Sequence, residues 1–174
     1  IEVARLVCDH TGGRVLILAP LGVVHQTIAE GARLGVQITY ARSQSDVAPS
    51  GLIICNYEMV RHLDPSAFAG VILDEASILK DFEGKTRTAL IAMFQETPYR
   101  FVATATPSPN DIAELANYAE FLGVMTRADM LASFFVHDDE GWRLKRHARN
   151  PMSRWLASWA MCLKRPSNLG YDDT

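Results

Sequence analysis

The stretch VILDEAS, residues 71–77, joins three apolar residues directly to two adjacent acids. A short apolar run without alternation is typical of a strand buried on both faces of a parallel sheet. Asp74 and Glu75 then stand at the carboxyl end of that strand, the edge where ligands of open α/β sheets bind. Ionised carboxylates resist burial without partners, so the pair predicts either a bound ligand or a structural role.

Two interpretations of the acid pair are open from this stretch alone. In the first, a Mg²⁺ ion that bridges nucleotide phosphates supplies the missing positive charge, because Mg²⁺ accepts one or two carboxylates together with waters. The neighbouring acid can then orient or deprotonate an attacking water. In the second, the pair caps a helix that starts after the strand, an arrangement that produces the same letters.

Apolar strands and helices alternate on both sides of this stretch. The sequence predicts strands at 15–19, 36–40, 52–55, 71–73 and 100–103, and helices at 1–9, 23–34, 57–62, 84–95 and 112–122. This alternation predicts βαβ units and an α/β fold, in which helices flank a parallel sheet on both faces. Asn110 and Asp111 are expected to cap the last of these helices.

The second informative stretch is FVATATP, residues 101–107. It predicts another buried strand, which ends in the hydroxyl residues Thr104 and Thr106. Because the carboxyl ends of parallel strands meet at one edge, these hydroxyls could hydrogen-bond to the acid pair and to whatever group binds there.

The pattern changes after Gly123. Residues 134–136 and 142–144 flank a polar, glycine-containing turn and predict a hairpin-like excursion. A helix is expected from about Pro151, with core or packing positions at Trp155, Leu156, Trp159, Met161 and Leu163. We therefore expect one lobe with two parts, residues 1–124 and residues 125–174.

The formal net charge of −3 does not favour a dedicated DNA-binding module, which is usually basic. Strong nucleic-acid binding by these 174 residues alone is therefore not expected. Basic residues do become frequent late in the chain: Arg143, Lys145, Arg146, Arg149, Arg154, Lys164 and Arg165. Such a run is either a strip that faces phosphates or a solvated helix face.

The three cysteines, Cys8, Cys55 and Cys162, are far apart in sequence. Cys55 lies in an apolar run and is expected to be a small buried residue in a reducing compartment. Cys8 and His10 lack a second ligand pair at zinc spacing, so a structural zinc site is disfavoured. No apolar run approaches the roughly 20 residues of a membrane span, so no membrane association is expected.

Four motifs in order resemble those of superfamily-two helicases, and among them the Swi/Snf-like ATPases, especially the phage-type members. VLILAPLGVVHQ (15–26) is similar to motif Ia, and IICNYEMV (53–60) is similar to motif Ib. ILDEAS (72–77) stands where the DEAD or DEAH box stands, and FVATATPSPND (101–111) resembles motif III. The resemblance implies the first RecA-like lobe of a P-loop NTPase, found in the cytoplasm of a bacterial or phage-infected cell.

The resemblance also implies residue roles in an ATP-dependent DNA helicase or translocase, which couples hydrolysis of Mg-ATP to movement on DNA. Asp74 would hold Mg²⁺ through water, Glu75 would be the catalytic base, and Thr104 and Thr106 would sense the bound nucleotide. The nucleic-acid strand would pass near Pro20, Gln26 and Tyr57. The implied cofactors are ATP and Mg²⁺, and the implied partners are double-stranded DNA and a second RecA-like lobe.

The sequence departs from the family in two places. Ser77 stands where many members have His or Asp, and no G-x-x-x-x-G-K-[ST] loop precedes the box. Gly84-Lys85-Thr86 follows the box and starts a predicted helix, so we do not expect it to be the phosphate loop. In the family that loop would lie just before Ile1. The alternative is a non-catalytic interaction domain that keeps the helicase fold without a phosphate loop.

Overall fold

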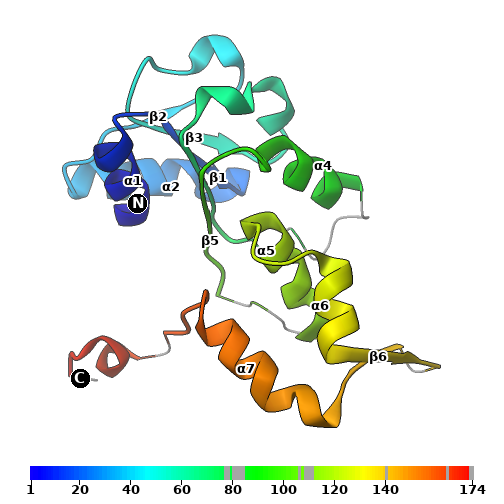
Figure 1. Ribbon diagram of the computed structural model, residues 1–174. Coiled ribbons are helices and arrows are strands. Elements are labelled where there is room, and N and C mark those ends of the chain that lie inside the picture. The colour runs from blue at the N-terminus through cyan, green and yellow to red at the C-terminus, as the bar shows by residue number, and fades with distance from the viewer. Residues whose placement is uncertain are drawn as a thin grey trace. The chain divides into compact units, whose positions relative to one another are not determined.

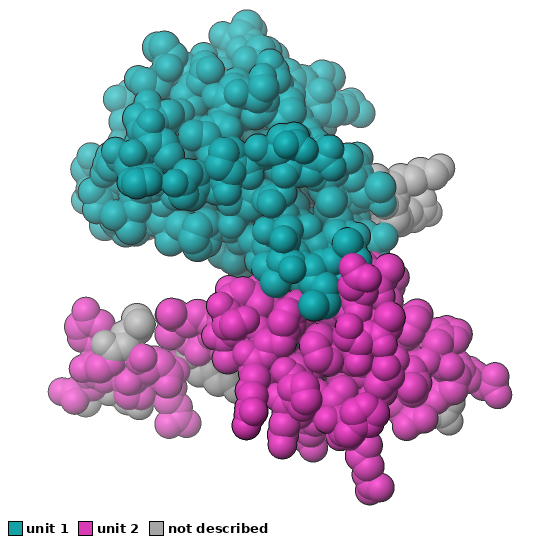
Figure 2. Space-filling model, viewed as in Figure 1, with its two compact units in different colours: residues 1–126 teal, residues 127–174 magenta. Residues whose placement is uncertain are grey.

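The computed structural model describes residues 1–76, 79, 85–105, 107, 112–139, 141–163 and 165–172. Its contacts divide the chain into two compact units, residues 1–126 and residues 127–174 (Figure 2). Each unit has its own secondary structure and is described separately below.

The first unit contains a parallel sheet with the strand order β2-β3-β1-β4-β5. Its strands are β1 (Val15–Ala19), β2 (Ile38–Tyr40), β3 (Leu52–Asn56), β4 (Gly70–Leu73) and β5 (Tyr99–Val102). Both neighbours of β1 are parallel to it and non-consecutive in sequence, as βαβ crossovers require. The predicted α/β class is confirmed.

Helices cover both faces of this sheet (Figure 1). Helices α1 (Glu2–Thr11) and α2 (Leu21–Arg33) lie on one face, and α4 (Lys85–Phe94) and α5 (Leu115–Leu122) lie on the other. The connecting segments contain the short 3₁₀ turns η1 (Gln44–Asp46), η2 (Val60–His62), η3 (Pro65–Ala67) and η4 (Ile112–Glu114).

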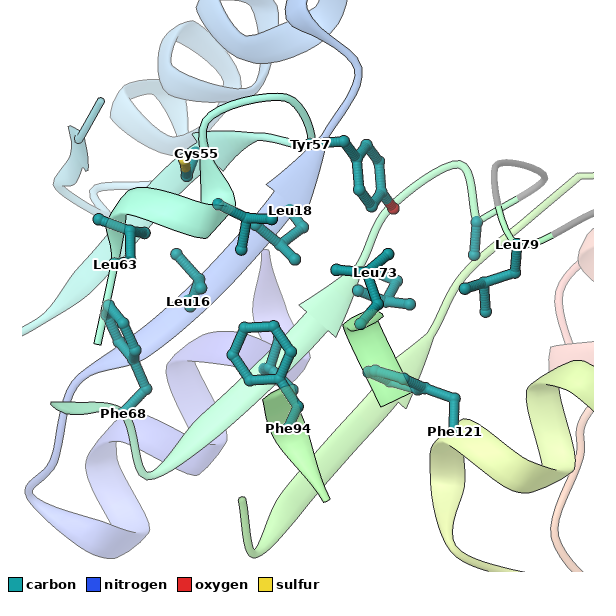
Figure 3. Close-up of a cluster of buried hydrophobic side chains, with 14 of the residues drawn as sticks. Leu16, Leu18, Cys55, Tyr57, Leu63, Phe68, Leu73, Leu79, Phe94 and Phe121 are labelled. Atoms are coloured by element: carbon teal, nitrogen blue, oxygen red, sulfur yellow. The ribbon is translucent and has the colours of Figure 1, made fainter. Parts of the chain in front are cut away.

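Successive residues of the central strands point into two different cores. On β1, Leu16 and Leu18 join a cluster that contains Phe94 and Phe121 from α4 and α5 (Figure 3). Ile17 between them joins a second cluster on the α1 and α2 face. Every position of the strand is therefore apolar because both faces are covered. Burial of each such side chain contributes about 1.5–3 kcal/mol.

The strand predicted at 100–103 is not buried as expected. Tyr99 and Phe101 of β5 are exposed, Phe101 by 44%, whereas Val102 packs against the α4 and α5 cluster. Within the described part of the chain, β5 pairs on one side only, with β4. An edge strand that is covered mainly on one face keeps the side chains of its other face accessible. A run of apolar residues in the sequence does not distinguish such a strand from one that is buried on both faces.

Several predicted boundaries also shift for local reasons. The second helix begins at Leu21 instead of Val23, because Pro20 directly precedes its first turn. The second strand starts only at Ile38, because the N–H of Val36 bonds to the carbonyl of Gly31 at the end of α2. The helix expected at 57–62 is a turn followed by the 3₁₀ turn η2.

The second unit contains α6 (Arg127–Phe134), an antiparallel hairpin, and α7 (Arg149–Ala157). The hairpin pairs β6 (Phe135–Asp138) with β7 (Gly141–Leu144), and the 3₁₀ turns η5 (Arg146–Ala148) and η6 (Pro166–Leu169) complete the unit.

The predicted hairpin is confirmed, whereas α6 was not predicted. The final helix ends at Ala157, so the expected packing roles of Met161 and Leu163 are wrong, and Met161 is 80% exposed. None of the helices in the described part of the chain has both the length and the apolar character that a bilayer crossing requires.

Two glycines of α2 provide a test of how closely this helix packs. A Cβ atom on Gly31 would lie 2.7 Å from Cδ1 of Ile38 and 2.9 Å from the carbonyl oxygen of Val36, whereas one on Gly22 would meet nothing within 4 Å. We expect Gly31→Ala to lower the free energy of unfolding by about 1–3 kcal/mol through overpacking. We expect Gly22→Ala to raise it by up to about 1 kcal/mol. Urea unfolding followed by circular dichroism measures both, and equal effects of the two changes would contradict the packing of α2 on β2.

Candidate functional site

The acid pair lies in a turn at the carboxyl edge of the sheet. Residues 74–76 form this turn directly after β4. The N–H of Asp74 donates to the carbonyl of Leu18 at 2.7 Å, and the N–H of Ala76 donates to the carbonyl of Ala103 at 3.0 Å. β1 and β5 are the strands on either side of β4, and bonds to their carboxyl ends therefore fix the backbone before and after Glu75.

Glu75 has a left-handed backbone, with φ of 48°, and no other non-glycine residue in the described part of the chain has a positive φ. For an L-residue this conformation costs roughly 1–2 kcal/mol. It persists only where surrounding bonds determine the backbone, and such residues are concentrated at functional sites. The outlier thus falls on a residue that the sequence predicted as catalytic.

Tyr57 lies directly under this turn. It follows β3, is 5% exposed, and its hydroxyl donates to the carbonyl oxygen of Asp74 at 2.9 Å. Figure 3 shows its hydroxyl directed toward the segment after β4. Burial, followed by the nearby charges of Asp74 and Glu75, raises the pKa of this phenol far above its usual value. Tyr57 therefore acts as a neutral donor that holds the peptide bond between the two acids.

A cavity of about 400 Å³ opens beside the acid pair, on the face of the sheet that α1 and α2 cover. Asp74 and Glu75 supply carboxylates, as does Glu30 of α2, which is paired with Arg33, and Gln26 of α2 supplies an amide. The rest of its wall is mostly apolar and is made by Ile1, Val3, Ile17, Val23, Thr27, Ile72, Phe101, Val102 and Ala103. A mostly apolar cavity with a few convergent polar groups is typical of a small-molecule site.

The start of α1 also lines the cavity. Ile1 and Val3 contribute apolar side chains to the same wall as Asp74 and Glu75.

The structure brings together three of the predicted site residues, Asp74, Glu75 and Gln26, on one cavity. Pro20 is the half-buried residue before α2, and Thr104 is half-buried just after β5. The side chain of Tyr57 is buried and bonded to Asp74, so its predicted contact with nucleic acid stays a prediction. Ser77, Thr106, Asn110 and Asp111 lie outside the described residues.

Sequence reasoning missed two parts of the site: the anchoring role of Tyr57 and the contribution of the first turn of α1. An aromatic residue with a polar tip right after a buried strand was a usable signal for the first. The second depends on which face of the sheet α1 covers, and the amphipathic pattern of α1 does not indicate that face.

The carboxylates suit Mg²⁺ better than a metal held entirely by protein. In the described part of the chain, no three His, Cys, Asp or Glu side chains gather closely enough to hold an ion. Two adjacent carboxylates match the way proteins hold Mg²⁺ together with waters and substrate phosphates. Cys55 is buried, which raises the pKa of its thiol to about 11, so it is an inert core residue as expected.

No known protein-family model matches the chain, and no curated protein matches it. Function must therefore be argued from the site, because an α/β sheet supports many activities.

The strain at Glu75 predicts an unusual order of stabilities. Glycine adopts a positive φ without penalty and alanine does not, so we expect Glu75→Gly to be more stable than Glu75→Ala by about 1 kcal/mol. Both variants remove the same side-chain interactions. The matched pair at Glu30, inside helix α2, should show the opposite order by a similar amount. Thermal or urea unfolding measures all four, and the same order at both positions would contradict the left-handed conformation.

The bond from Tyr57 predicts a stability loss that depends on pH. Tyr57→Phe leaves the part-buried carbonyl of Asp74 without this donor and should lower the free energy of unfolding by about 1–2 kcal/mol at neutral pH. The folded state raises the pKa of Tyr57, so its stabilisation is complete below about pH 10 and is lost above it, where the unfolded phenol ionises. The gap between wild type and variant should therefore narrow at about pH 11. Tyr171→Phe, at a 69% exposed position, is the control and should change nothing.

Proposed function

We propose that this chain is the first lobe of an ATP-dependent DNA helicase or translocase, and that its cavity takes the phosphates of Mg-ATP. The observation that carries the proposal is the position of Asp74 and the strained Glu75 on one cavity at the carboxyl edge of a parallel sheet. Carboxylates alone would repel a polyphosphate. A divalent cation that such carboxylates hold through water suits a phosphate group.

Within this proposal the two acids have different roles. Asp74 lies at the end of β4 and would hold the water shell of Mg²⁺, whose charge neutralises the phosphates. Glu75 would accept the proton of the attacking water, and its side chain lines the cavity from a fixed backbone. Tyr57 is a positioning residue, since it contacts the backbone of Asp74 and not the cavity.

The topology of the sheet supports a phosphate loop that leads into α1. Helix α2 carries the chain from β1 toward the β2 edge, and α1 covers the same face. Because parallel crossovers are right-handed, a parallel strand that leads into α1 must come from the β5 side of the sheet. Positions beside β1 are taken, so that strand would pair with β5 and its loop would reach the cavity. Among the described strands β5 pairs only with β4, so its outer edge is open to such a neighbour.

Nucleic acid and a second lobe complete the proposal. Pro20 lies at the carboxyl end of β1, and Gln26 of α2 lines the same cavity as the acid pair. The motif resemblance assigns both residues to the path of the nucleic-acid strand. Contacts there would go to phosphates, with little base recognition. The alternative is an interaction domain that has kept this fold without binding nucleotide, and nucleotide binding separates the two.

The full-length product of the gene tests the proposal. We expect it to hydrolyse ATP when DNA is added, and we expect residues 1–174 alone to show no turnover. Glu75→Gln should lower the turnover at least about 100-fold, because it removes the base and keeps the shape. Binding of a fluorescent ATP analogue should persist in that variant.

Glu96→Gln is the matched control, because Glu96 is exposed and lies outside the cavity. Its turnover should equal that of the wild type. Near-normal turnover of the Glu75→Gln variant would refute the role of Glu75. A full-length protein that binds no nucleotide would instead favour the interaction domain.

A further inference from the structure

The charges of this chain are separated along the sequence. Residues 1–140 contain ten Lys or Arg and eighteen Asp or Glu, whereas residues 141–171 contain seven Lys or Arg and no acid. The two remaining acids are Asp172 and Asp173. Although the net charge of the whole chain is only −3, residues 141–171 form a strongly basic segment. This segment lies in the second unit, after α6 and β6.

Helix α7 and the 3₁₀ turn η5 before it arrange part of this charge on one face. Arg146, Arg149, Asn150, Ser153 and Arg154 are all exposed, and their spacings of three or four residues place them on the same side. We call these five residues the basic face. From Arg146 to Arg154 it extends roughly 12 Å, at 1.5 Å per helical residue.

The opposite side of α7 holds the helix in place. Ala148 and Met152 are buried. Trp155 packs between Phe134 of α6 in a tilted contact and Trp159 in an edge-to-face contact, with ring centroids 5.4 Å and 5.1 Å away. Aromatic contacts of this kind add about 0.5–1.5 kcal/mol each beyond burial. The basic face is therefore presented by a packed helix with a fixed side toward solvent.

Other cations of the basic segment already have partners inside the unit. Arg143 donates to the carboxylate of Asp138 across the hairpin at 2.9 Å, and Lys145 donates to the carbonyl of Ala132 at the end of α6. By contrast, none of the ion pairs among the described residues involves Arg146, Arg149 or Arg154. These three guanidinium groups carry donors that the fold itself does not use.

We propose that the basic face binds the sugar-phosphate backbone of a nucleic acid strand, without recognition of its bases. Phosphates of one strand follow at about 3.4 Å along the helix axis, so roughly 12 Å of helix can serve about three of them. The planar guanidinium group of arginine can donate two parallel hydrogen bonds to phosphate oxygens, and the amide of Asn150 can donate to the same ligand. The hydroxyl of Ser153 donates within the helix, to the carbonyl of Arg149.

An anionic membrane is the less favoured partner. Helices that bind membranes insert an exposed apolar side beneath their basic residues. The apolar side of α7, with Ala148 and Met152, is instead packed inside the protein. The proposal does not rest on the nucleotide site, since it concerns a surface of the other unit and needs no ATP.

Fluorescence anisotropy of labelled single-stranded and double-stranded oligonucleotides of mixed sequence tests the basic face, with the 174-residue chain and no nucleotide. We expect measurable binding at about 50 mM salt that weakens steeply with added salt. The triple variant Arg146→Gln, Arg149→Gln, Arg154→Gln should bind at least about tenfold more weakly. Its slope of log K against log salt should be smaller by about 2–3.

The control triple variant Arg5→Gln, Arg33→Gln, Arg42→Gln makes the same charge change on exposed residues of the first unit. It should bind within about twofold of wild type. The proposal is overturned if wild type shows no binding, if both triple variants lose affinity equally, or if the first keeps wild-type affinity and salt slope. Binding to phosphatidylserine vesicles without binding to oligonucleotides would overturn it in favour of a membrane. Unchanged circular dichroism and melting of both variants exclude unfolding as the cause of a loss.

Discussion

Burial of the central strands on both faces is the constraint on which the first unit depends. β1 and β3 are fully buried between two layers of helices, so no charged side chain can stand along them without a large desolvation penalty. Polar chemistry is therefore confined to the ends of the strands. The carboxyl edge holds Asp74, Glu75 and Thr104, and the cavity opens beside it. The position of the candidate site thus follows from the same burial that stabilises the sheet.

At that edge of the sheet, several hydrogen bonds hold the turn after β4. Leu18 and Ala103 receive its backbone N–H groups, and Tyr57 donates to the carbonyl of Asp74 from below. These bonds together offset the left-handed conformation of Glu75. Three separate strand ends thus fix the backbone on both sides of Glu75, and constraint of this kind is what keeps a strained residue in place.

A different constraint applies to residues 141–171, which contain no acid. Each cation there must be satisfied by a backbone carbonyl, by a carboxylate from another part of the chain, by solvent or by an external anion. Lys145 uses the carbonyls at the end of α6, and Arg143 uses Asp138 of the preceding strand. The arginines of α7 have neither option on their exposed side. The net charge of the whole chain does not describe the local charge of this basic face. For that reason the net charge was a poor guide to where nucleic acid could bind.

The amino-acid sequence by itself determined the α/β class, the central strands and the place of Asp74 and Glu75 at a strand end, because apolar runs and chain order are local properties. It also determined the hairpin around Gly141. It did not reveal the exposure of β5, the helix α6 or the early end of α7, since each depends on neighbours that the local pattern does not name. Only the tertiary structure placed the hydroxyl of Tyr57 on the carbonyl of Asp74, brought the start of α1 to the same cavity as Glu75 and gave Glu75 its positive φ. These features arise where β1, β3, β4 and β5 converge, and residues distant in sequence meet there only after the sheet has formed.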